Sequence, residues 1–424
     1  MRQSHLFTRT RREAPKDETA KNAQLLIRAG FIQKMQAGVY SYLPLGERVI
    51  ERIKTIIRDE MNAIGGQEVS LASLQEKEMW TKTGRWDDAV VDNWFKTKLK
   101  NDTELGLGFT HEEPLSTLLK DHIRSFRDLP AYIYQFQTKF RNEKRAKSGI
   151  LRGREFLMKD LYSFSATEDG RAQFYEKVKE AYVRIFRKAG IGDRTFVTFA
   201  SGGSFAQFSH EFQMLTDAGE DIIYVNKEKG IAVNQEVYND DVLAQLNLKK
   251  DDLVEEKAVE VGNIFNLGTK FSEPLELMFQ AEDGSMQPVI MGSYGIGVPR
   301  LMGAIVEACS DEKGIVWPRS VAPFDIHLIH VSGSDETASR ADKLYRDLQD
   351  VGFEVLYDDR ALVRAGEKFA DADLIGLPTW IVVSDKNMMG DKVVFEVKDR
   401  KSGEVTNVAE DEILVRMNLL RNSQ

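Results

Sequence analysis

A glycine-rich segment near residue 295 places the strongest limit on how this chain folds. The segment reads Gly292-Ser-Tyr-Gly295-Ile-Gly297-Val-Pro-Arg300, follows a short apolar strand pattern at 288–291 and opens a helical pattern at 299–308. A dinucleotide-binding βαβ turn needs a third glycine three residues after the second glycine of Gly-x-Gly, and Arg300 occupies that position. The sequence therefore excludes a Rossmann turn at this junction.

Two roles remain open for the junction. Glycines on a strand allow a flat ligand to lie against the backbone, and an arginine at the head of the next helix can bind phosphate oxygens with its planar guanidinium group. The alternative is a tight strand–helix junction with a surface arginine. The segment alone does not choose between a nucleotide site and this structural role.

The strand patterns before this segment predict an antiparallel sheet. Patterns at 67–74, 106–110 and 131–140 follow one another without a helix between each pair, which is not typical of βαβ folds. Apolar residues at steps of three and four predict amphipathic helices at 46–64 and 170–189. We therefore expect an α+β fold with an antiparallel sheet flanked by helices.

A second domain follows a short proline-containing linker at 317–323. From residue 325 the pattern alternates strand, helix, strand, helix and strand, which is typical of an α/β domain. We place the boundary between residues 320 and 321, giving domains 1–320 and 321–424. A charged stretch at 220–259 is too small for a substantial core of its own, so we interpret it as a short insertion or hairpin on the first sheet.

Composition limits the class of protein. The 424 residues are 42% hydrophobic, enough for two domains with cores, and a net charge of -9 argues against a protein that coats nucleic acid indiscriminately. A single cysteine, Cys309, excludes an internal disulfide, and no Cys/His cluster has zinc-site spacing. No apolar run approaches the roughly 20 residues that span a bilayer, and the N-terminal residues do not form a secretory signal. We therefore expect a soluble, cytoplasmic protein with no membrane partner.

Basic residues concentrate in one predicted hairpin. Seven lysines and arginines lie between residues 139 and 154, against the single acid Glu143. A purine can stack on the ring of Phe156 while the Glu143 carboxylate reads its amino group and Arg141 and Arg152 neutralise phosphates. For the first strand taken alone, an ordinary salt bridge between Arg141 and Glu143 is the alternative.

These motifs resemble those of the class II aminoacyl-tRNA synthetases. Phe140-Arg-x-Glu143 with Arg152-x-x-x-Phe156 is similar to their motif 2, and Gly295-x-Gly297-x-x-Arg300 to their motif 3. Other segments resemble the bacterial-type prolyl-tRNA synthetases, and the likeness covers nearly the whole chain. These segments are Gly38-Val-Tyr-Ser-Tyr-Leu-Pro44-Leu-Gly46, Thr110-His-Glu112-Glu113, Gln137-Thr-Lys-Phe-Arg141, Arg154-Glu-Phe-Leu-Met158-Lys-Asp160, Ser209-His-Glu-Phe212 and Leu267-Gly-Thr-Lys270.

The resemblance implies a class II catalytic domain followed by an anticodon-binding domain. It implies a reaction in which proline and ATP form prolyl-adenylate, and the prolyl group passes to the 3' end of tRNA(Pro). Arg141 and Arg300 would be the catalytic residues. Mg²⁺ would share the phosphate charge, with ligands that the sequence does not identify. The implied ATP-binding residues are Arg141 at the α-phosphate, Glu143 at the adenine edge, Phe156 stacked on adenine, Arg152 and Arg300 at the outer phosphates, and Gly295 and Gly297 beside them.

The resemblance also implies where proline binds. Thr110 and Glu112 would bind its amino group, and Arg141 its carboxylate. Three further side chains, alternating along one strand face, are candidates for the ring pocket together with a nearby histidine. Core packing or an ordinary structural role is the alternative for each of these, which are Met158, Asp160, Tyr162 and His210.

Contacts with tRNA are implied for three basic residues, Arg145, Arg360 and Lys368. Solvated surface charge is the alternative for each of them. The resemblance further implies a homodimer, whose interface we expect to be altered because Ala72 stands where motif 1 usually has proline. Near the site, Phe109 replaces a usual proline and Asn263 a usual histidine, and we expect Phe109 to tighten or reshape the pocket.

One departure from the family is an absence. Many bacterial relatives carry a folded editing domain between motifs 2 and 3 that hydrolyses mischarged alanyl-tRNA. The stretch 220–259 stands there in this chain, so we expect no editing in cis, and either some mischarging or a separate protein that removes alanine in trans.

Two other interpretations stay open. The chain could be a class II synthetase for another small amino acid such as threonine, against which the missing zinc ligands speak. It could also be a synthetase-like binding or regulatory protein that lacks the chemistry. The presence of Arg141, Glu143 and Arg300 together argues against the second interpretation, since a degenerate site has no physical need for them.

Overall fold

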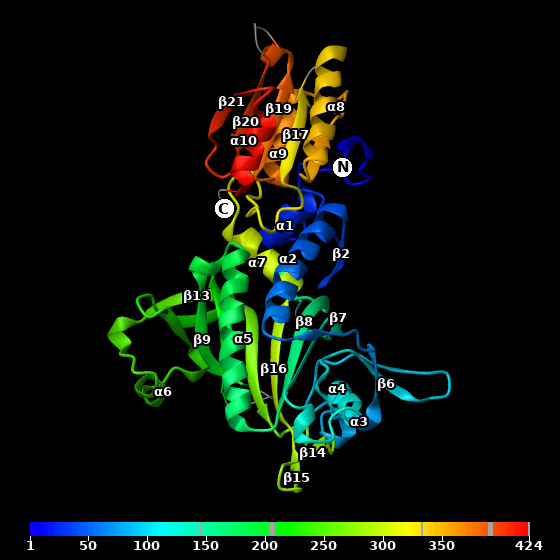
Figure 1. Cartoon of the computed structure of the whole chain (residues 1–424), viewed down its shortest axis with the longest axis vertical. Helices are drawn as coiled ribbons and strands as arrows, with labels where there is room; N and C mark the ends of the chain where they lie inside the picture. The colour runs from blue at the N-terminus through cyan, green and yellow to red at the C-terminus, as the bar shows by residue number, and fades with distance from the viewer. Residues whose placement is uncertain (145, 203–207, 332–333, 389–392, 423–424) are drawn as a thin grey trace. The chain divides into compact units, whose positions relative to one another are not determined.

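The computed structural model describes residues 1–144, 146–202, 208–331, 334–388 and 393–422. The chain forms two compact units, whose elements are labelled in Figure 1. One unit comprises Lys34–Tyr40 and Ile53–Ala304, and the other comprises Met1–Gln33, Ser41–Arg52 and Ile305–Gln424. The N-terminal segment thus belongs to the same unit as the C-terminal part of the chain. The linear division at residue 320 stays a prediction.

The larger unit is built on a nine-stranded sheet with the strand order β10-β9-β12-β11-β13-β16-β8-β7-β3. Its central pairs β7–β8, β8–β16 and β16–β13 are antiparallel, which confirms the predicted fold class. Among the described strands of this sheet, the β3–β7 and β12–β9 pairs are parallel. The strands are β3 (Gln67–Glu68), β7 (Ala131–Phe140), β8 (Glu155–Ser165), β9 (Thr195–Ser201), β10 (Phe208–Leu215), β11 (Asp221–Asn226), β12 (Ile231–Asn234), β13 (Val254–Gly268) and β16 (Ile290–Gly297).

Helix α5 (Glu168–Lys188) covers one face of this sheet (Figure 1). The helix begins where the Thr167 side chain accepts the Gly170 N–H, and its acidic first turn and basic last turn complement the helix dipole. Along β8, Lys159 and Leu161 face this helix and are fully buried. Side chains alternate along a strand, so the intervening residues of β8 lie on the other face, where they line a cavity.

Shorter elements surround the main sheet. The strand expected at 67–74 was wrong in its extent, because β3 ends at Glu68 and β4 begins at Leu74 in a separate sheet of order β4-β6-β5. Between them, Leu71 bonds with the side-chain amides of Gln135 and Gln137 instead of a strand backbone. The elements are β4 (Leu74–Glu76), α3 (Lys77–Lys82), β5 (Lys96–Lys98), β6 (Glu104–Leu107), α4 (Glu112–Leu119), β14 (Met278–Gln280) and β15 (Met286–Pro288), with 3-10 turns at Phe126–Asp128, Gly149–Leu151 and Gly192–Arg194.

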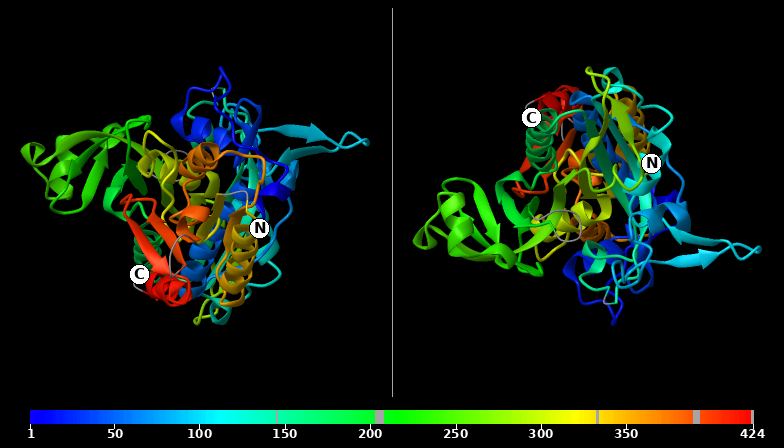
Figure 2. Two further views of the ribbon diagram at one scale, coloured as in Figure 1. Left: turned by 90° about the horizontal axis from the view of Figure 1, so that it is seen from above. Right: turned by 90° about the horizontal axis from the view of Figure 1, so that it is seen from below.

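The charged stretch at 220–259 forms the β11–β12 hairpin, helix α6 (Asp240–Gln245) and the start of β13. In Figures 1 and 2 these elements, drawn in green, project from one side of the larger unit. Two 3-10 turns, Gln235–Val237 and Lys250–Asp252, complete the segment. It encloses a small apolar cluster of its own, made of Val233, Val237, Val242, Leu243 and Leu248.

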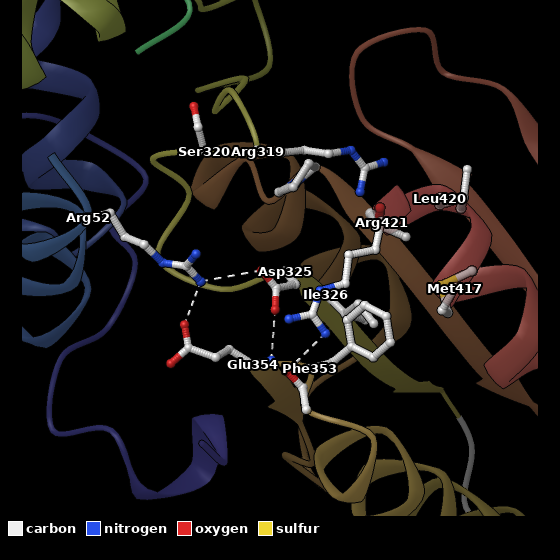
Figure 3. Close-up of a pocket in the computed structure, with 13 residues that line it drawn as sticks. Arg52, Arg319, Ser320, Asp325, Ile326, Phe353, Glu354, Met417, Leu420 and Arg421 are labelled. Carbon is white, nitrogen blue, oxygen red and sulfur yellow. Dashed lines mark hydrogen bonds and ion pairs between the residues drawn. The ribbon is translucent and has the colours of Figure 1, made fainter. Parts of the chain in front are cut away.

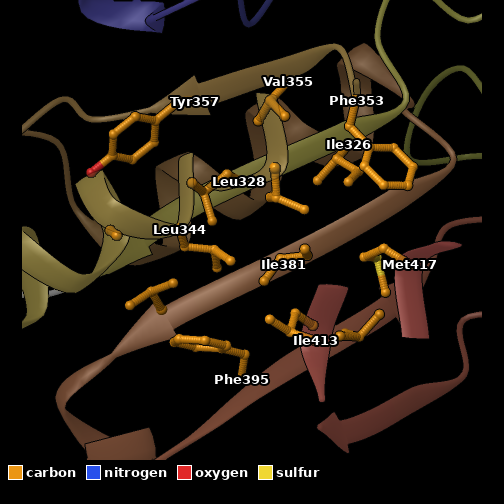
Figure 4. Packing of buried hydrophobic residues seen from close by; sticks show 14 of the residues in the cluster. Ile326, Leu328, Leu344, Phe353, Val355, Tyr357, Ile381, Phe395, Ile413 and Met417 are labelled. Carbon is orange, nitrogen blue, oxygen red and sulfur yellow. The ribbon is translucent and has the colours of Figure 1, made fainter. Parts of the chain in front are cut away.

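The smaller unit contains a five-stranded sheet of order β18-β17-β19-β20-β21. Its first three strands are parallel and its last two are antiparallel, in line with the α/β pattern expected from residue 325. Figure 4 shows its core, where side chains such as Leu328, Ile381 and Phe395 pack together with no exposed surface. The elements are α1 (Lys21–Arg28), β17 (Ile326–Val331), α8 (Asp335–Asp350), β18 (Val355–Asp358), α9 (Ala365–Ile375), β19 (Thr379–Ser384), β20 (Val394–Asp399), β21 (Val405–Ala409) and α10 (Ile413–Asn422), with 3-10 turns at Gln3–His5 and Asp385–Met388.

The N-terminal segment extends this sheet. Arg2 forms a parallel bridge with Tyr357 of β18, and the Tyr357 N–H donates to the Met1 carbonyl at 2.9 Å. Such a pairing between residues some 355 positions apart leaves no periodic signal in the sequence. Four elements contribute residues to both units: β1 (Ile32–Gln36), β2 (Val39–Tyr42), α2 (Pro44–Ala63) and α7 (Val298–Ala308).

The smaller unit also has a cavity of about 490 Å³ (Figure 3). On one wall, Arg52 forms ion pairs with Asp325 and Glu354, and Asp325 accepts the Glu354 N–H at 2.9 Å. Arg319 and Arg421 lie on the other side, near apolar side chains of α10. None of the site residues expected from the sequence lines this cavity.

Gly376, which ends helix α9, should be essential for the stability of the smaller unit. Its φ is +79°, and an added Cβ would stand 2.0 Å from the Ile315 carbonyl oxygen. Gly376→Ala should therefore lower the free energy of unfolding by about 2–4 kcal/mol, from left-handed strain and a backbone clash. Gly366 in the same helix is a matched control, because a Cβ there meets no atom within 4 Å. Urea unfolding of both variants, followed by circular dichroism, checks the prediction, and equal midpoints would contradict it.

Candidate active site

Two adjoining cavities lie in the larger unit, on the sheet face opposite α5. Their volumes are about 260 and 130 Å³, and Arg141, Glu260 and Arg300 line both. The expected ATP contacts Glu143 and Arg152 line the first cavity, together with Glu220 and Asp221. The second cavity brings together most of the side chains expected to bind proline, and the glycines of β16: Thr110, Glu112, Met158, Asp160, Tyr162, Gly295 and Gly297.

Arg141 lies at the junction of the two cavities. It follows the last residue of β7, and its N–H donates to the Arg154 carbonyl at 2.8 Å. The centre of its guanidinium group is 5.0 Å from the Phe109 ring centroid and 5.4 Å from that of Phe156. Its buried Nε has no hydrogen-bond partner among the described residues. Two aromatic rings thus fix the guanidinium group while a donor is left for a ligand.

Two of the expected nucleotide contacts pair with each other. Arg152 donates from Nη2 to the Glu143 carboxylate at 2.8 Å and from Nε at 3.1 Å. Arg152 also lies 3.5 Å from the Glu220 carboxylate, which comes from the segment just before β11. The hairpin of β7 and β8 therefore presents a fork-shaped ion pair at the mouth of the first cavity.

Arg300 lies in the first turn of α7, immediately after the glycines of β16. Its Nε donates to the Leu151 carbonyl at 2.9 Å, and its Nη1 donates to the Glu260 carboxylate at 2.7 Å. Burial lowers the pKa of Arg141, and the positive charge of Arg300 lowers it further. Two guanidinium groups that destabilise each other's charge form a site suited to an anion.

The glycines of β16 leave the floor of the second cavity open. An added Cβ at Gly295 would make only an ordinary contact with the Met158 sulfur, at 3.7 Å. A Cβ at Gly297 would stand 3.3 Å from the Cβ of Arg300, which is tighter than most real contacts. Glycine at 295 therefore keeps space for a ligand, and glycine at 297 gives the arginine room.

The second cavity has a negatively charged wall. The Thr110 hydroxyl donates to Glu112 Oε2 at 2.5 Å, and the Ser293 hydroxyl donates to Glu112 Oε1 at 3.1 Å. Arg85 lies 3.6 Å from Glu112 and pairs more closely, at 3.0 Å, with Glu113. Burial raises the pKa of Glu113 to about 7, and Glu113 does not line the cavity, so Glu112 is the glutamate of this wall. A cationic group of modest size fits here, as expected for an amino group.

Two expected site residues lie elsewhere. His210 on β10 does not line either cavity, because its Nδ1 is 2.8 Å from the Tyr175 hydroxyl and its ring packs against Phe199. Burial lowers the pKa of His210 to about 4. Phe156 lines neither cavity and contacts Arg141. The structure gives the proline-binding role of His210 no support, and Arg145 lies outside the described residues.

The two expected tRNA contacts in the smaller unit are engaged internally. Arg360 pairs with Asp358 at 2.6 Å and with Asp371 at 2.9 Å. Lys368 is 3% exposed and donates to the His330 carbonyl at 2.7 Å. Neither side chain is free for a direct contact with a base in this conformation, so their role at tRNA stays a prediction without structural support.

Sequence reasoning placed Asn263 near the site but missed the polar cluster around it, formed by Glu211 on β10 with Glu260 and Asn263 on β13. Glu260 lines both cavities and Asn263 lines the second, while Glu211 lines neither. Asn263 Nδ2 donates to Glu260 at 3.0 Å and to Glu211 at 3.4 Å. Burial raises the pKa of Glu211 to about 8, and the negative charge of Glu260 contributes. Within the described part of the chain, the buried Asn263 Oδ1 has no hydrogen-bond partner. The cluster comes from two strands that are distant in sequence, so spacing could not reveal it.

This cluster fits a hard divalent cation better than a transition metal. Mg²⁺ is bound through one or two carboxylates together with substrate phosphates and water, and it prefers oxygen ligands. Two carboxylates and a free amide oxygen match that preference. The described residues contain no group of three or more His, Cys, Asp or Glu side chains that could hold a metal by themselves. None of the helices in the described ranges is long and apolar enough to cross a membrane.

Comparisons with known proteins match both parts of the chain. Residues 95–309 match the family described as tRNA synthetase class II core domain (G, H, P, S and T), and residues 321–417 match the family described as anticodon binding domain. The chain is 40% identical to the proline--tRNA ligase of Hyphomonas neptunium, with 98% of this chain and 99% of the relative covered. It is 35% identical to that of Listeria monocytogenes, with 99% of each chain covered.

A solved structure shares the fold. The prolyl-tRNA synthetase from Cryptosporidium parvum, complexed with L-proline and AMP, matches with a TM-score of 0.76 and 17% identity, covering 95% of this chain and 75% of that chain. The antiparallel sheet and the arginines that line both cavities are those expected of a class II synthetase, and both matched families point to a tRNA synthetase. The chain belongs to the prolyl-tRNA synthetases, a class II family of aminoacyl-tRNA ligases.

Proposed function

We propose that the two adjoining cavities form one adenylation site, in which ATP occupies the larger cavity and proline the smaller. The observation that carries this proposal is the position of Arg141, which lines both cavities and lies between two aromatic rings. An arginine at such a junction can bind the α-phosphate and the amino-acid carboxylate with one planar group. The fold shared with the Cryptosporidium parvum structure, which holds L-proline and AMP, supports this pairing.

In the proposed reaction the proline carboxylate attacks the α-phosphorus of ATP. A new bond forms between a carboxylate oxygen and phosphorus, the bond to the β-phosphate oxygen breaks, and pyrophosphate leaves. A carboxylate is already ionised at neutral pH, so positioning and charge neutralisation replace a general base. Arg141 then fixes the attacking and attacked groups, Arg300 and Arg152 hold the outer phosphates, and Glu143 holds the adenine edge. Stacking of adenine on Phe156 stays a prediction, because this ring lies against Arg141 and lines neither cavity.

Mg²⁺ would be held by the cluster of Glu211, Glu260 and Asn263, where the free Asn263 Oδ1 offers a neutral oxygen ligand. The bound ion would neutralise phosphate charge. In the second half-reaction, a 3'-terminal hydroxyl of tRNA(Pro) attacks the prolyl carbonyl and AMP leaves. The match of residues 321–417 to the anticodon binding domain supports tRNA as the acceptor. We further propose a homodimer in a reducing, cytoplasmic setting.

The proposal is tested by pyrophosphate exchange into ATP across a panel of amino acids. Exchange that depends on proline supports the proposed site. Exchange with threonine or another amino acid in its place would show a different specificity. No exchange with any amino acid would show a protein that kept the fold without the chemistry.

We also propose that this chain does not edit its product in cis. The segment at 220–259 forms a hairpin and one short helix on the sheet. The alignment with the Listeria monocytogenes relative runs over 570 positions, about 150 more than the roughly 420 residues of this chain that it includes. The Hyphomonas neptunium alignment runs over only 446 positions, so relatives of both lengths exist. These lengths support the proposal that this chain lacks a segment that its longer relatives have, so that removal of alanine would need a separate protein.

Purified enzyme should therefore accumulate alanyl-tRNA when supplied with alanine. A pocket built for proline cannot strongly exclude a smaller side chain, so kcat/KM for alanine should be roughly 10²–10⁴-fold below that for proline. Alanyl-tRNA(Pro) made beforehand should keep its amino acid in the presence of this enzyme as long as in buffer. The longer Listeria monocytogenes enzyme and the Hyphomonas neptunium enzyme, which is similar in length to this chain, are the comparisons, and rapid deacylation by the present chain would contradict the proposal.

A further inference from the structure

A buried aspartate in the smaller cavity carries an uneven set of hydrogen bonds. Asp160 Oδ2 accepts from Lys139 Nζ, from Gln135 Nε2 and from the Tyr162 hydroxyl, each at 2.9 Å. Its other oxygen, Oδ1, is buried and has no partner in the part of the chain that the structure describes. Asp160 lines the cavity that we assign to proline. A carboxylate oxygen without a donor at a ligand cavity is an acceptor that a ligand can use.

Lys139 is the cation that faces this aspartate, and it has no exposed surface. Its second contact is with His111 Nδ1, at 2.6 Å. His111 Nε2 lies 3.1 Å from the Ala72 carbonyl oxygen, which can only accept, so the proton is on Nε2 and Nδ1 accepts from the lysine. The ammonium of Lys139 is therefore bound between a neutral imidazole and a carboxylate.

These contacts determine which groups are charged. Burial lowers the pKa of His111 to about 4, and the Lys139 charge lowers it further, so the imidazole is neutral at physiological pH. Burial alone would raise the pKa of Asp160, but the Lys139 charge and the hydrogen bonds from Gln135 and Lys139 hold it below its usual value. Burial lowers the pKa of Lys139 and the Asp160 carboxylate offsets part of this effect, so Lys139 is the cation of this group.

We propose that Lys139 is a positioning residue for amino-acid recognition, which keeps Asp160 ionised and leaves Oδ1 as a second acceptor for the prolyl ammonium. The first acceptor is the Thr110–Glu112 pair on the wall of the same cavity. A secondary ammonium has two N–H groups, and two carboxylates provide one acceptor for each. This inference rests on the proposed function, because it assigns proline to the smaller cavity.

Other ionisable groups lie near Asp160 and bear on the test. Tyr162, on β8, has a pKa raised well above its usual value by burial and by the charges of Asp160 and Glu112. Arg141, just after β7, stays charged because an arginine does not deprotonate in proteins. Glu112, the first residue of α4, lies on the wall of the same cavity. His111 precedes α4, and its pKa rises in the variant as well, because the Lys139 charge that lowers it is gone. A new titration near neutral pH in Lys139→Met that is absent when Asp160→Asn is added would therefore report Asp160.

The test is the pH dependence of proline binding in Lys139→Met, measured by pyrophosphate exchange between pH 6 and 9. Removal of the lysine charge raises the pKa of Asp160, and a protonated carboxyl accepts an N–H poorly. The KM for proline should rise roughly 10-fold or more at pH 6–7 and should fall toward the wild-type value as pH increases. The KM for ATP should change little. A proline KM raised by the same factor at every pH, or unchanged, would overturn the proposal.

Lys159→Met is the matched control. Lys159 is also fully buried, and it lies on β8 but faces α5, where it donates to the Tyr182 hydroxyl at 2.5 Å and the Tyr294 carbonyl at 3.0 Å. This variant should lose stability without a new pH dependence of the proline KM. The same pH dependence in both variants would mean that loss of any buried lysine disturbs the site, and would overturn the specific role of Lys139.

The acceptor is also tested with Lys139 in place, so the inference does not depend on the folding of Lys139→Met alone. Asp160→Asn removes the acceptor charge directly, so it should raise the proline KM by a similar factor at all pH values. In an Asp160→Asn background, Lys139→Met should add little to the KM, because the two residues act as one unit. A full additional effect would contradict the proposal. Wild-type enzyme without proline-dependent exchange would instead refute the proposed function, which separates the two failures.

Discussion

Replacing Arg141 by alanine should lower kcat/KM for proline-dependent pyrophosphate exchange by about 10³-fold or more. Arg141 lines both cavities, and its guanidinium group is fixed between Phe109 and Phe156. A preorganised cation that meets both the attacking carboxylate and the α-phosphate stabilises charge that moves between them in the transition state. We expect kcat to fall and the KM for proline to rise, measured by steady-state exchange at saturating and limiting proline.

Two variants separate this role from general damage to the hairpin. Arg141→Lys keeps the charge but loses the planar fork, so it should recover only a small part of the activity. Arg154→Ala is the matched control, because Arg154 follows in the same hairpin but donates only to the main-chain carbonyls of Glu143 and Ala37. Near wild-type exchange in Arg141→Ala, or an equal loss in Arg154→Ala, would refute the role assigned to Arg141.

Replacing Arg300 by alanine should strongly lower pyrophosphate exchange while leaving tRNA binding largely intact. The expected loss is about 10²–10³-fold in kcat/KM for ATP, since one preorganised charge at the outer phosphates is removed. The Glu260 carboxylate, which accepts from Arg300 at 2.7 Å, would then repel the nucleotide. We expect the KM for proline to change less than the KM for ATP, in contrast to Arg141→Ala.

The measurement pairs exchange kinetics with filter binding of tRNA(Pro) at fixed salt. Arg300→Lys should restore part of the ATP affinity, because a single charge still meets the phosphates. A parallel loss of exchange and of tRNA binding would show that Arg300 supports the fold of the unit and not the nucleotide. The contrast between the proline and ATP constants of the two arginine variants is the sharper result, since it separates Arg300, which meets ATP, from Arg141, which meets both substrates.

Local sequence patterns predicted the antiparallel sheet because strands without intervening helices limit the topology. They also singled out Arg141 and Arg300, which the structure brings to one wall although 158 positions separate them. Arg141 follows the end of a strand and Arg300 lies at the start of a helix. At both places the local backbone conformation determines the direction of the side chain. The sequence also predicted that Met158, Asp160 and Tyr162 lie on one face, since every second side chain of a strand points to the same side of the sheet.

Other features of the fold and of the site could not be predicted, because they depend on packing between residues that are distant in sequence. Lys139 on β7 and Lys368 on α9 look like surface charges in the sequence, yet both are buried, and their partners Asp160 and His330 come from other elements of the fold. Nothing local distinguishes a lysine that pairs across a sheet from one that meets water. The cluster of Glu211, Glu260 and Asn263 was missed for a similar reason, because it forms only when β10 pairs with β13.

The register of β8 has a consequence for how such an enzyme can change its substrate. Met158, Asp160 and Tyr162 face the cavity, and Lys159 and Leu161 face α5. A single-residue insertion in this strand would exchange the two faces, bringing a lysine into the amino-acid pocket and a carboxylate under the helix. Amino-acid preference can therefore evolve here by replacement of side chains, but a change in strand length by one residue would remove recognition and the core together.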